Sequence, residues 1–263
     1  MGNPLPTLSY SWVVPALRED GTQAVLKLSF PGDQEFATEA AALTAFGGRG
    51  ICRLLELDLT PGAMLLERLQ PGAPLAAIED DEEATALAAG VMKNLRRLPP
   101  SDHAFPTVSD WAGGFDRMRS RFDGGTGPMP EDLVGKAETL FAELLASEEE
   151  RLLLHGDLHH ENILSAGDES WLAIDPKGVV GEAAYEAAAL LHNPVGTLDM
   201  LDPRGLLERR LDVLSDGLGL DRGLVHAWGL AQAVLAAYWS LEDCGRVWDE
   251  ALTFAGLLAE IPD

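Results

Sequence analysis

A short segment in the second half of the chain, residues 151–175, constrains the fold most, because it interrupts a helical stretch with strand-like runs. RLLLH, NILS and WLAID are three such runs, and turn residues separate the last two. The preceding residues 84–98, 110–122 and 131–147 have helical patterns, and helical patterns resume after Gly181. The sequence therefore predicts a small sheet inserted into a mainly helical region.

The beginning of the chain has a different pattern. Residues 24–30 alternate in the manner of a strand, and residues 63–69 form another strand-like run. Between them, Asp33 is the expected N-cap of a helix over residues 34–46, which ends at two glycines. We therefore expect a strand, a helix and a further strand in this order.

The composition changes near residue 75, where we place a domain boundary. Residues 1–75 form a strand-rich unit with five basic and eight acidic side chains, and residues 76–263 form a mainly helical unit that holds most of the acidic ones. The whole chain has 19 Lys and Arg against 43 Asp and Glu, a formal charge of −24. Such acidity argues against nucleic acid or an anionic membrane as the partner. A small cationic partner stays open.

Three further features bear on the compartment. Residues 1–20 lack the pattern of a signal peptide. Cys52 and Cys244 lie far apart and form no disulfide or metal-binding pattern, which favours a reducing environment. Residues 223–241 carry no formal charge and are long enough to be considered as a membrane span, but their polar residues, small residues and acidic flanks favour a buried core helix. We expect a cytoplasmic protein.

The residues that follow the strand-like run RLLLH, which ends at His155, carry the chemistry. The sequence His-Gly-Asp-Leu-His-His-Glu-Asn spans residues 155–162, and Asp175 lies eighteen residues after Asp157 at the end of an apolar run. An Asp followed by an Asn five positions later is the spacing of a kinase catalytic loop. There the Asp orients or deprotonates the acceptor hydroxyl, and the Asn holds a metal ion. Asn162 and Asp175 offer oxygen ligands of the kind that Mg²⁺ prefers.

A zinc site is the first alternative for this segment. His159, His160 and Glu161 do not form the HExxH pattern, because no histidine follows at the required distance. A second alternative is a strand end followed by an ordinary polar turn. Asn162 and the downstream Ile-Asp-Pro favour the kinase-like interpretation over both.

The sequence around these residues resembles a known superfamily. LHGDLHHENIL followed by LAIDPKG is similar to the aminoglycoside phosphotransferase and choline kinase superfamily, and IDPKGVVGEAAYEAAALLHNP with AAYWSLEDCG most resembles its streptomycin and hydroxyurea phosphotransferase branch. The resemblance covers essentially the whole chain. It implies an α+β, bilobal, protein-kinase-like fold, with a small β-rich N-terminal lobe and a larger, mainly α-helical C-terminal lobe. It also implies ATP and Mg²⁺ as cofactors.

The resemblance implies roles for individual residues. Asp157 corresponds to the catalytic base, supported by His155 in the same loop, and Asn162 and Asp175 correspond to the Mg²⁺ ligands. Lys27, in the strand tetrapeptide Ala-Val-Leu-Lys, corresponds to the phosphate-binding lysine of kinases.

Glu39 is the expected ion-pair partner of Lys27, because helical spacing places it on the same side as Phe36 and Leu43. A solvated edge-strand lysine and an ordinary surface carboxylate are the alternatives for these two residues.

The remaining nucleotide contacts rest on position alone. Glu67 and Leu69 fall where the family joins its lobes, so their backbone groups would meet the adenine edge. No glycine-rich loop precedes the Lys27 strand, and the hydroxyls and amides of Ser9 and Ser11 are the candidates that would cover phosphate instead.

Acceptor recognition needs carboxylates, because aminoglycosides are polycations and guanidinium groups pair with carboxylates in a bidentate manner. The candidates are Glu182, Glu186, Glu242 and Asp243, with Trp239 as a flat wall for a cation. Solvent-facing acids and a core tryptophan are the alternatives for these residues.

The leading hypothesis is an ATP-dependent kinase that phosphorylates a hydroxyl of a small cationic or polyhydroxy substrate, with streptomycin-like aminoglycosides as the first acceptor. A kinase of an endogenous alcohol or sugar, similar to the choline or fructosamine kinases, uses the same machinery. A nucleotide- or ligand-binding relative without activity is the third hypothesis, and it is motivated by the missing glycine loop.

Overall fold

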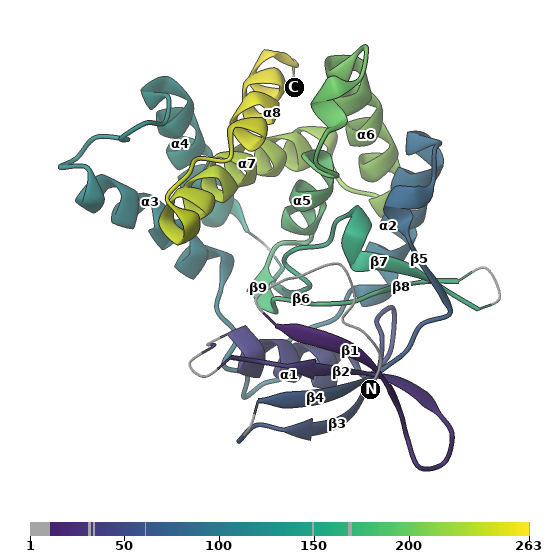
Figure 1. Ribbon diagram of the computed structural model, residues 1–263. Coiled ribbons are helices and arrows are strands. Elements are labelled where there is room, and N and C mark those ends of the chain that lie inside the picture. The colour runs from purple at the N-terminus through teal and green to yellow at the C-terminus, as the bar shows by residue number, and fades with distance from the viewer. Residues whose placement is uncertain are drawn as a thin grey trace.

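The computed structural model describes residues 11–30, 33, 35–60, 62–148, 150–167 and 170–262. It has two lobes, which Figure 1 shows one above the other. The smaller lobe contains a four-stranded sheet and one helix, and the larger lobe contains most of the helices and two small sheets. The predicted α+β bilobal fold is confirmed.

The small lobe is built on an antiparallel sheet in the order β1-β2-β4-β3. Its elements are β1 (Trp12–Leu17), β2 (Gln23–Leu28), α1 (Glu35–Phe46), β3 (Leu54–Asp58) and β4 (Ala63–Glu67). The strands predicted over 24–30 and 63–69 are β2 and β4, and the predicted helix is α1. Strands β1 and β3 had not been predicted.

Both ends of α1 are held by side chains. At its beginning, the Asp33 carboxylate accepts hydrogen bonds from the backbone N–H groups of Glu35 and Phe36, at 2.9 and 3.3 Å. At its end, the Arg97 guanidinium donates to the carbonyl groups of Ala45 and Phe46. A cation at a helix C-terminus also stabilises the helix dipole. Because Arg97 belongs to the large lobe, this contact fixes α1 relative to that lobe.

The large lobe begins with a short strand that pairs within one of its own two sheets. Its strands are β5 (Pro71–Pro74), β6 (Leu152–Leu154), β7 (Ile163–Ala166), β8 (Ser170–Ala173) and β9 (Val179–Gly181). They form the sheets β5-β7-β8 and β6-β9. Since β5 already pairs with β7, strand pairing passes to the large lobe a few residues before the boundary expected near residue 75.

Helices make up the rest of this lobe. They are α2 (Asp81–Leu95), α3 (Val108–Arg121), α4 (Glu131–Ser147), α5 (Ala188–Leu191), α6 (Pro203–Leu218), α7 (Arg222–Cys244) and α8 (Asp249–Glu260). The short 3₁₀ turns are η1 (Leu75–Ala77), η2 (His160–Asn162), η3 (Ala183–Ala187) and η4 (Thr197–Asp199). Three of the helices, α2, α3 and α4, match the predicted helical stretches.

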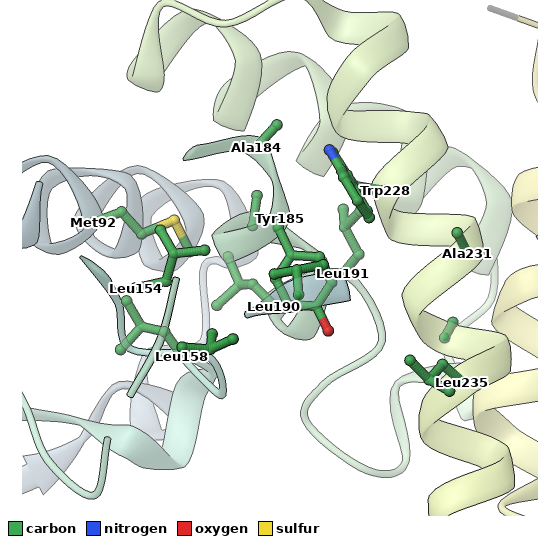
Figure 2. Close-up of a cluster of buried hydrophobic side chains, with 14 of the residues drawn as sticks. Met92, Leu154, Leu158, Ala184, Tyr185, Leu190, Leu191, Trp228, Ala231 and Leu235 are labelled. Carbon is green, nitrogen blue, oxygen red and sulfur yellow. The ribbon is translucent and has the colours of Figure 1, made fainter. Parts of the chain in front are cut away.

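The core of the large lobe lies under the candidate catalytic loop, residues 155–162. Figure 2 shows Leu154 and Leu158 at one end of a buried apolar cluster, with Tyr185 and Trp228 beyond them. Helix α7 runs through this core and packs against α4, α5 and α8. By length and hydropathy it is the single candidate membrane span among the described residues, but 78% of that window is buried inside the protein. It is therefore a core helix, as the sequence predicted.

Candidate active site

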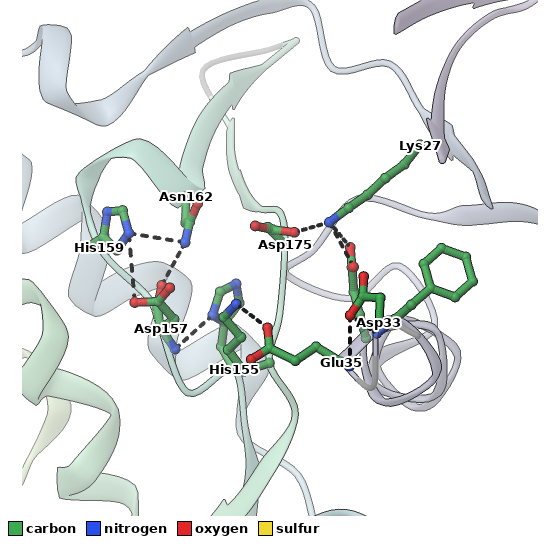
Figure 3. A network of polar contacts seen from close by, with 11 residues as sticks. Lys27, Asp33, Glu35, His155, Asp157, His159, Asn162 and Asp175 are labelled. Carbon is green, nitrogen blue, oxygen red and sulfur yellow. Dashed lines mark hydrogen bonds and ion pairs between the residues drawn. The ribbon is translucent and has the colours of Figure 1, made fainter. Parts of the chain in front are cut away.

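The centre of the site is an ion network that joins the two lobes. The Lys27 side chain on β2 is buried, and its Nζ donates to both Glu39 oxygens on α1, at 2.8 and 2.7 Å. It also contacts Asp175 of the large lobe (Figure 3). Lys27 is therefore neither solvated nor alone, and the predicted partnership with Glu39 is present.

The charges in this network depend on one another. Burial disfavours the Lys27 ammonium, but the two carboxylates outweigh this effect and hold its pKa above the ordinary value. Burial raises the pKa of Glu39 to about 7 despite the attraction of Lys27. Burial also disfavours the Asp175 carboxylate, yet the attraction of Lys27 keeps its pKa below the ordinary value. A positive Lys27 thus faces an ionised Asp175.

The catalytic loop is positioned by a buried histidine. His155 is completely buried, and burial lowers its pKa to about 4, so the ring is neutral. Its Nε2 lies 2.7 Å from the carbonyl oxygen of Ile174 and therefore carries the proton. Its Nδ1 accepts the backbone N–H of Asp157 at 3.3 Å. His155 supports the loop and fixes the backbone from which the Asp157 side chain extends.

Glu186 holds the same loop from below. Its carboxylate accepts the backbone N–H groups of His155 at 2.6 Å and Gly156 at 2.9 Å. Burial raises the pKa of Glu186 to about 7, although these two donors act in the opposite direction. Gly156 has a φ of +86°, and a Cβ there would lie 2.7 Å from the Trp111 ring. The tight turn therefore requires glycine immediately before Asp157.

Asp157 lines the cavity beside the loop, and its carboxylate points toward His159 and Asn162 (Figure 3). Its side chain is 39% exposed, and the His159 Nε2 lies 3.8 Å from its Oδ1. Burial at this position raises the pKa of Asp157, while His159 and Lys177 act against this shift. A carboxylate with a raised pKa and an open face is suited to accept a proton from a hydroxyl.

Asn162 and Asp175 lie beside Asp157. The Asn162 Nδ2 donates to the Asp157 carbonyl oxygen at 2.8 Å, which leaves the Oδ1 for another partner. The backbone N–H of Ile174 donates to the backbone carbonyl of Asn162 at 2.9 Å. This bond brings Asp175 next to Asn162. Asp175 has a positive φ of 61°.

These two side chains fit a Mg²⁺ ion that takes its other ligands from phosphates and water. Among the described residues no group of three His, Cys, Asp or Glu side chains forms a metal cluster. Such a cluster is not needed for Mg²⁺ held together with a nucleotide.

The predicted nucleotide contacts are only partly visible. The Glu67 carboxylate pairs with the Arg53 guanidinium, and the Glu67 N–H donates to the Arg53 carbonyl at 2.8 Å, so neither group is directed to a base. Leu69 follows β4 as a half-buried residue. Ser11 is buried at the start of β1, and Ser9 lies outside the described residues.

A cavity of about 610 Å³ opens beside the catalytic loop. Its lining includes Asp157 and His159 from the loop, Lys177 from the segment after β8, and the α7 side chains Trp239, Glu242 and Asp243. Three of the five predicted acceptor residues therefore line one cavity together with the candidate base.

The other two predicted acceptor residues do not line this cavity. Glu186 is buried beneath the loop, and both its oxygens accept backbone hydrogen bonds. Glu182 accepts the Trp228 Nε1–H at 2.8 Å. The expectation that these two acids bind the acceptor is therefore corrected. Both lie in the turn after β9, which folds back under the loop rather than toward the cavity.

The predicted residues on α7 have different surroundings. Glu242 forms a bidentate pair with Arg117 at 2.7 and 2.9 Å, so its charge is already balanced. Asp243 is exposed and makes no hydrogen bond or ion pair within the part of the chain that the structure describes. The Trp239 ring packs edge-to-face on Trp111, with 5.5 Å between the ring centres. Asp243 is therefore the acid on this helix that is available to a cation.

Sequence reasoning missed several residues of the cavity. Lys177 Nζ lies 2.7 Å from the Glu35 carboxylate on α1, and these two residues form a second contact between the lobes beside Asp157. The Lys177 backbone N–H also donates to the His155 carbonyl at 2.8 Å. The position of Lys177, two residues after Asp175, is the sequence feature that could have marked it as a residue of the site. Gln232, His192 and Trp248 also line the cavity, but nothing in their local sequence marked them.

Comparisons with known proteins show the family of the chain. Residues 1–244 match the family described as aminoglycoside/hydroxyurea antibiotic resistance kinase. The chain is 37% identical over 235 residues to the streptomycin 6-kinase of Streptomyces griseus, covering 89% of this chain and 76% of that protein. It is 36% identical over 237 residues to the hydroxyurea phosphotransferase of Kitasatospora aureofaciens, covering 88% and 66%.

Solved structures show the same fold. A choline/ethanolamine kinase family protein from Mesorhizobium loti superposes with a TM-score of 0.72 at 16% identity, covering 99% of this chain and 88% of that one. An aminoglycoside phosphotransferase in ternary complex with ADP and hygromycin B gives a TM-score of 0.66 at 17% identity, covering 98% and 92%. By its sequence match over most of its length, the chain belongs to the family of aminoglycoside/hydroxyurea antibiotic resistance kinases.

Proposed function

We propose that this kinase uses ATP to phosphorylate a hydroxyl group of a streptomycin-like aminoglycoside in the cytoplasm. The observation that supports the proposal most is the meeting of two arrangements at one place. The Lys27, Asn162 and Asp175 groups, suited to a nucleotide and its metal, lie next to Asp157, and Asp157 faces an acid-lined cavity.

Asp157 acts as the base in this proposal. The acceptor hydroxyl oxygen attacks the γ-phosphorus, the bond from that phosphorus to the β–γ bridging oxygen breaks, and the hydroxyl proton passes to the Asp157 carboxylate. ADP and the phosphorylated acceptor are the products. His155 and Glu186 hold the loop backbone, so the carboxylate needs little reorganisation when the hydroxyl arrives.

Lys27 binds the nucleotide phosphates, and Glu39 keeps its ammonium directed into the cleft. Asn162 Oδ1 and the Asp175 carboxylate would hold Mg²⁺, which when bound supplies positive charge against the phosphate oxygens. In the free protein Lys27 contacts Asp175, so we expect both groups to exchange this contact for the nucleotide and its metal.

The acceptor cavity favours a cationic ligand. Asp243 is unpaired at its open side, and the aromatic rings of Trp111 and Trp239 offer flat apolar surfaces. Guanidinium groups of the streptomycin type match a carboxylate beside aromatic faces. The similarity to streptomycin 6-kinases adds weight to this choice of acceptor.

Hydroxyurea is the second candidate, because a hydroxyurea phosphotransferase is 36% identical to this chain. Its molecule is far smaller than the cavity of about 610 Å³ and carries no cation for Asp243. The cavity therefore favours streptomycin as the better acceptor.

The test is a coupled assay of ADP release with Mg²⁺-ATP and separate additions of streptomycin, kanamycin, hydroxyurea and choline, with mass spectrometry of each product. We expect streptomycin-dependent ADP release and a product heavier by one phosphate. Release with choline alone would assign the protein to an endogenous alcohol, and no release with any acceptor would contradict the proposed activity.

A further inference from the structure

One face of α7 runs along the acceptor cavity from its buried end to its open end. Gln232, Ala236, Trp239 and Asp243 all line the cavity, and their spacing of four, three and four residues places them on one side of the helix. These eleven steps along the helix correspond to about 16 Å. Gln232 is only 4% exposed, whereas Asp243 is exposed. The two ends of the cavity therefore differ in solvent access.

The buried end contains a polar side chain, Gln232, that has no partner among the described residues. The Gln232 carboxamide makes no hydrogen bond within the described part of the chain, and its Oε1 is fully buried. His192 is 2% exposed, and its ring lies close enough to the Ala188 backbone for a hydrogen bond that opposes the effect of burial on its pKa. Burial lowers the pKa of His192 to about 3, so its ring is neutral. An unpaired buried polar group destabilises a fold, which makes the Gln232 carboxamide in the cavity wall informative.

The backbone around His192 is held in place by the buried side chain of Arg210. Arg210 is 1% exposed, and its NH1 donates to the carbonyl groups of Leu190 and Leu191 at 3.1 Å and of Asn193 at 2.6 Å. Its other nitrogens pair with the Asp81 carboxylate. Arg210 therefore fixes the backbone on both sides of His192.

A ring contact adds to this support. The His192 ring packs edge-to-face on Trp248, which also lines the cavity, with 5.2 Å between the ring centres. The His192 ring thus belongs to a preformed wall of the cavity.

We propose that Gln232 and His192 form a neutral subsite that binds an uncharged, hydroxyl-bearing ring of the acceptor. This inference rests on the proposed function, and it assigns the orientation of the acceptor. An amide offers a donor and an acceptor, as a hydroxyl does, and the neutral His192 imidazole adds the ring nitrogen that does not bond the Ala188 backbone. Neither group can balance a charge, so a cation at this end would lose its hydration without gaining a counter-ion. The cationic groups of the acceptor then face Asp243.

The variants Gln232→Leu and His192→Phe test the subsite, because each replaces a polar side chain by an apolar one of similar size. With streptomycin as the probe we expect the KM for streptomycin to rise about tenfold, the effect of one lost hydrogen bond, with the KM for ATP unchanged. Gln23→Leu is the matched control, since it removes an exposed amide in the small lobe. An unchanged KM for streptomycin in both cavity variants would overturn the proposal.

A second measurement does not depend on turnover of any acceptor. The melting temperature of Gln232→Leu should equal or exceed that of the unaltered protein, because the change removes an unpaired buried amide. A fall of several degrees would show that the amide has a structural partner, and the subsite would be wrong.

Calorimetric titration with myo-inositol, an uncharged polyhydroxy ring, completes the test. Weaker binding to Gln232→Leu than to the unaltered protein supports the subsite even where streptomycin is not phosphorylated, a result that would refute only the proposed acceptor. Equal binding to the two proteins, or no binding of either probe to the unaltered protein, overturns the subsite.

Discussion

The catalytic loop and the acceptor cavity adjoin each other, but their polar groups are satisfied in different ways. Around the loop, Lys27 contacts two carboxylates, His155 uses both ring nitrogens, and Glu186 accepts two backbone N–H groups. In the cavity, Gln232 and Asp243 make no such contacts among the residues described.

This difference separates two tasks. Groups that perform the chemistry must be preorganised, and mutual hydrogen bonds achieve this before any substrate binds. Groups that recognise the acceptor find their partners only when it arrives. Changes in the first region should therefore alter kcat for every acceptor, and changes in the second should alter KM for particular ones.

Apart from removal of the base itself, the largest expected effect follows from removing Lys27. In Lys27→Met we expect kcat to fall about 10²–10³-fold for every acceptor tested, because a cation that stabilises phosphate charge is lost. Steady-state assays with streptomycin and kanamycin measure the fall, and the exposed lysine variant Lys136→Met is the control. A loss confined to one acceptor would break the proposed division between the two regions.

A smaller effect is expected at the open end of the cavity. In Asp243→Asn the KM for streptomycin should rise about two- to fivefold, because a solvent-exposed charge pair contributes little. The increase should shrink at high salt, and kcat should stay the same. Asp216→Asn removes an exposed acid on α6 and is the control. A fall in kcat without a change in KM would place Asp243 with the catalytic groups instead.

The smallest effect concerns the dependence of stability on pH. Burial raises the pKa of Glu186 to about 7, so between its ordinary value of 4.5 and 7 the folded protein holds a proton that the unfolded chain has released. The contribution of this group is therefore fully present below the unfolded pKa and is lost as pH rises through about 7.

Urea unfolding of the unaltered protein and Glu186→Gln from pH 5 to 8 measures this contribution. As pH rises, the free energy of unfolding of the unaltered protein should fall relative to that of the variant, because Gln cannot ionise. The exposed variant Glu131→Gln is the control. Parallel curves for the unaltered protein and Glu186→Gln would show that Glu186 is ionised at pH 5 in the folded protein.

The sequence could predict which groups of the candidate catalytic loop lie together, because its parts are close together in the chain. Asp157 and Asn162 are five residues apart, and Lys27 and Glu39 are joined by one strand and one helix, so local periodicity places each pair. Asp175 follows the strand next to that loop. Few long-range contacts are needed within each of these groups, whereas the contact of Lys27 with Asp175 depends on how the two lobes pack.

The acceptor cavity could not be predicted in the same way. Its lining comes from α1, α3, α7 and the loops after β6, β8, α5 and α7, and their arrangement depends on packing between distant segments. Glu186 shows the limit, because its residue type suited the acceptor but η3 directs it under the loop.

Strand β1 was missed for a different reason. Pro15 argues against a strand, yet β1 is the edge strand of its sheet, where a missing N–H is tolerated. The sheet order that makes β1 an edge is a property of the folded lobe rather than of the local sequence.

The central claim is that Asp157 accepts the proton of the acceptor hydroxyl while its neighbours bind the nucleotide. A single-turnover assay with γ-labelled ATP and streptomycin, comparing the unaltered protein with Asp157→Asn, tests it most directly. We expect phosphoryl transfer to slow by about 10²–10⁴-fold, with the affinity for ATP unchanged. Transfer at the same rate in both proteins would contradict the account.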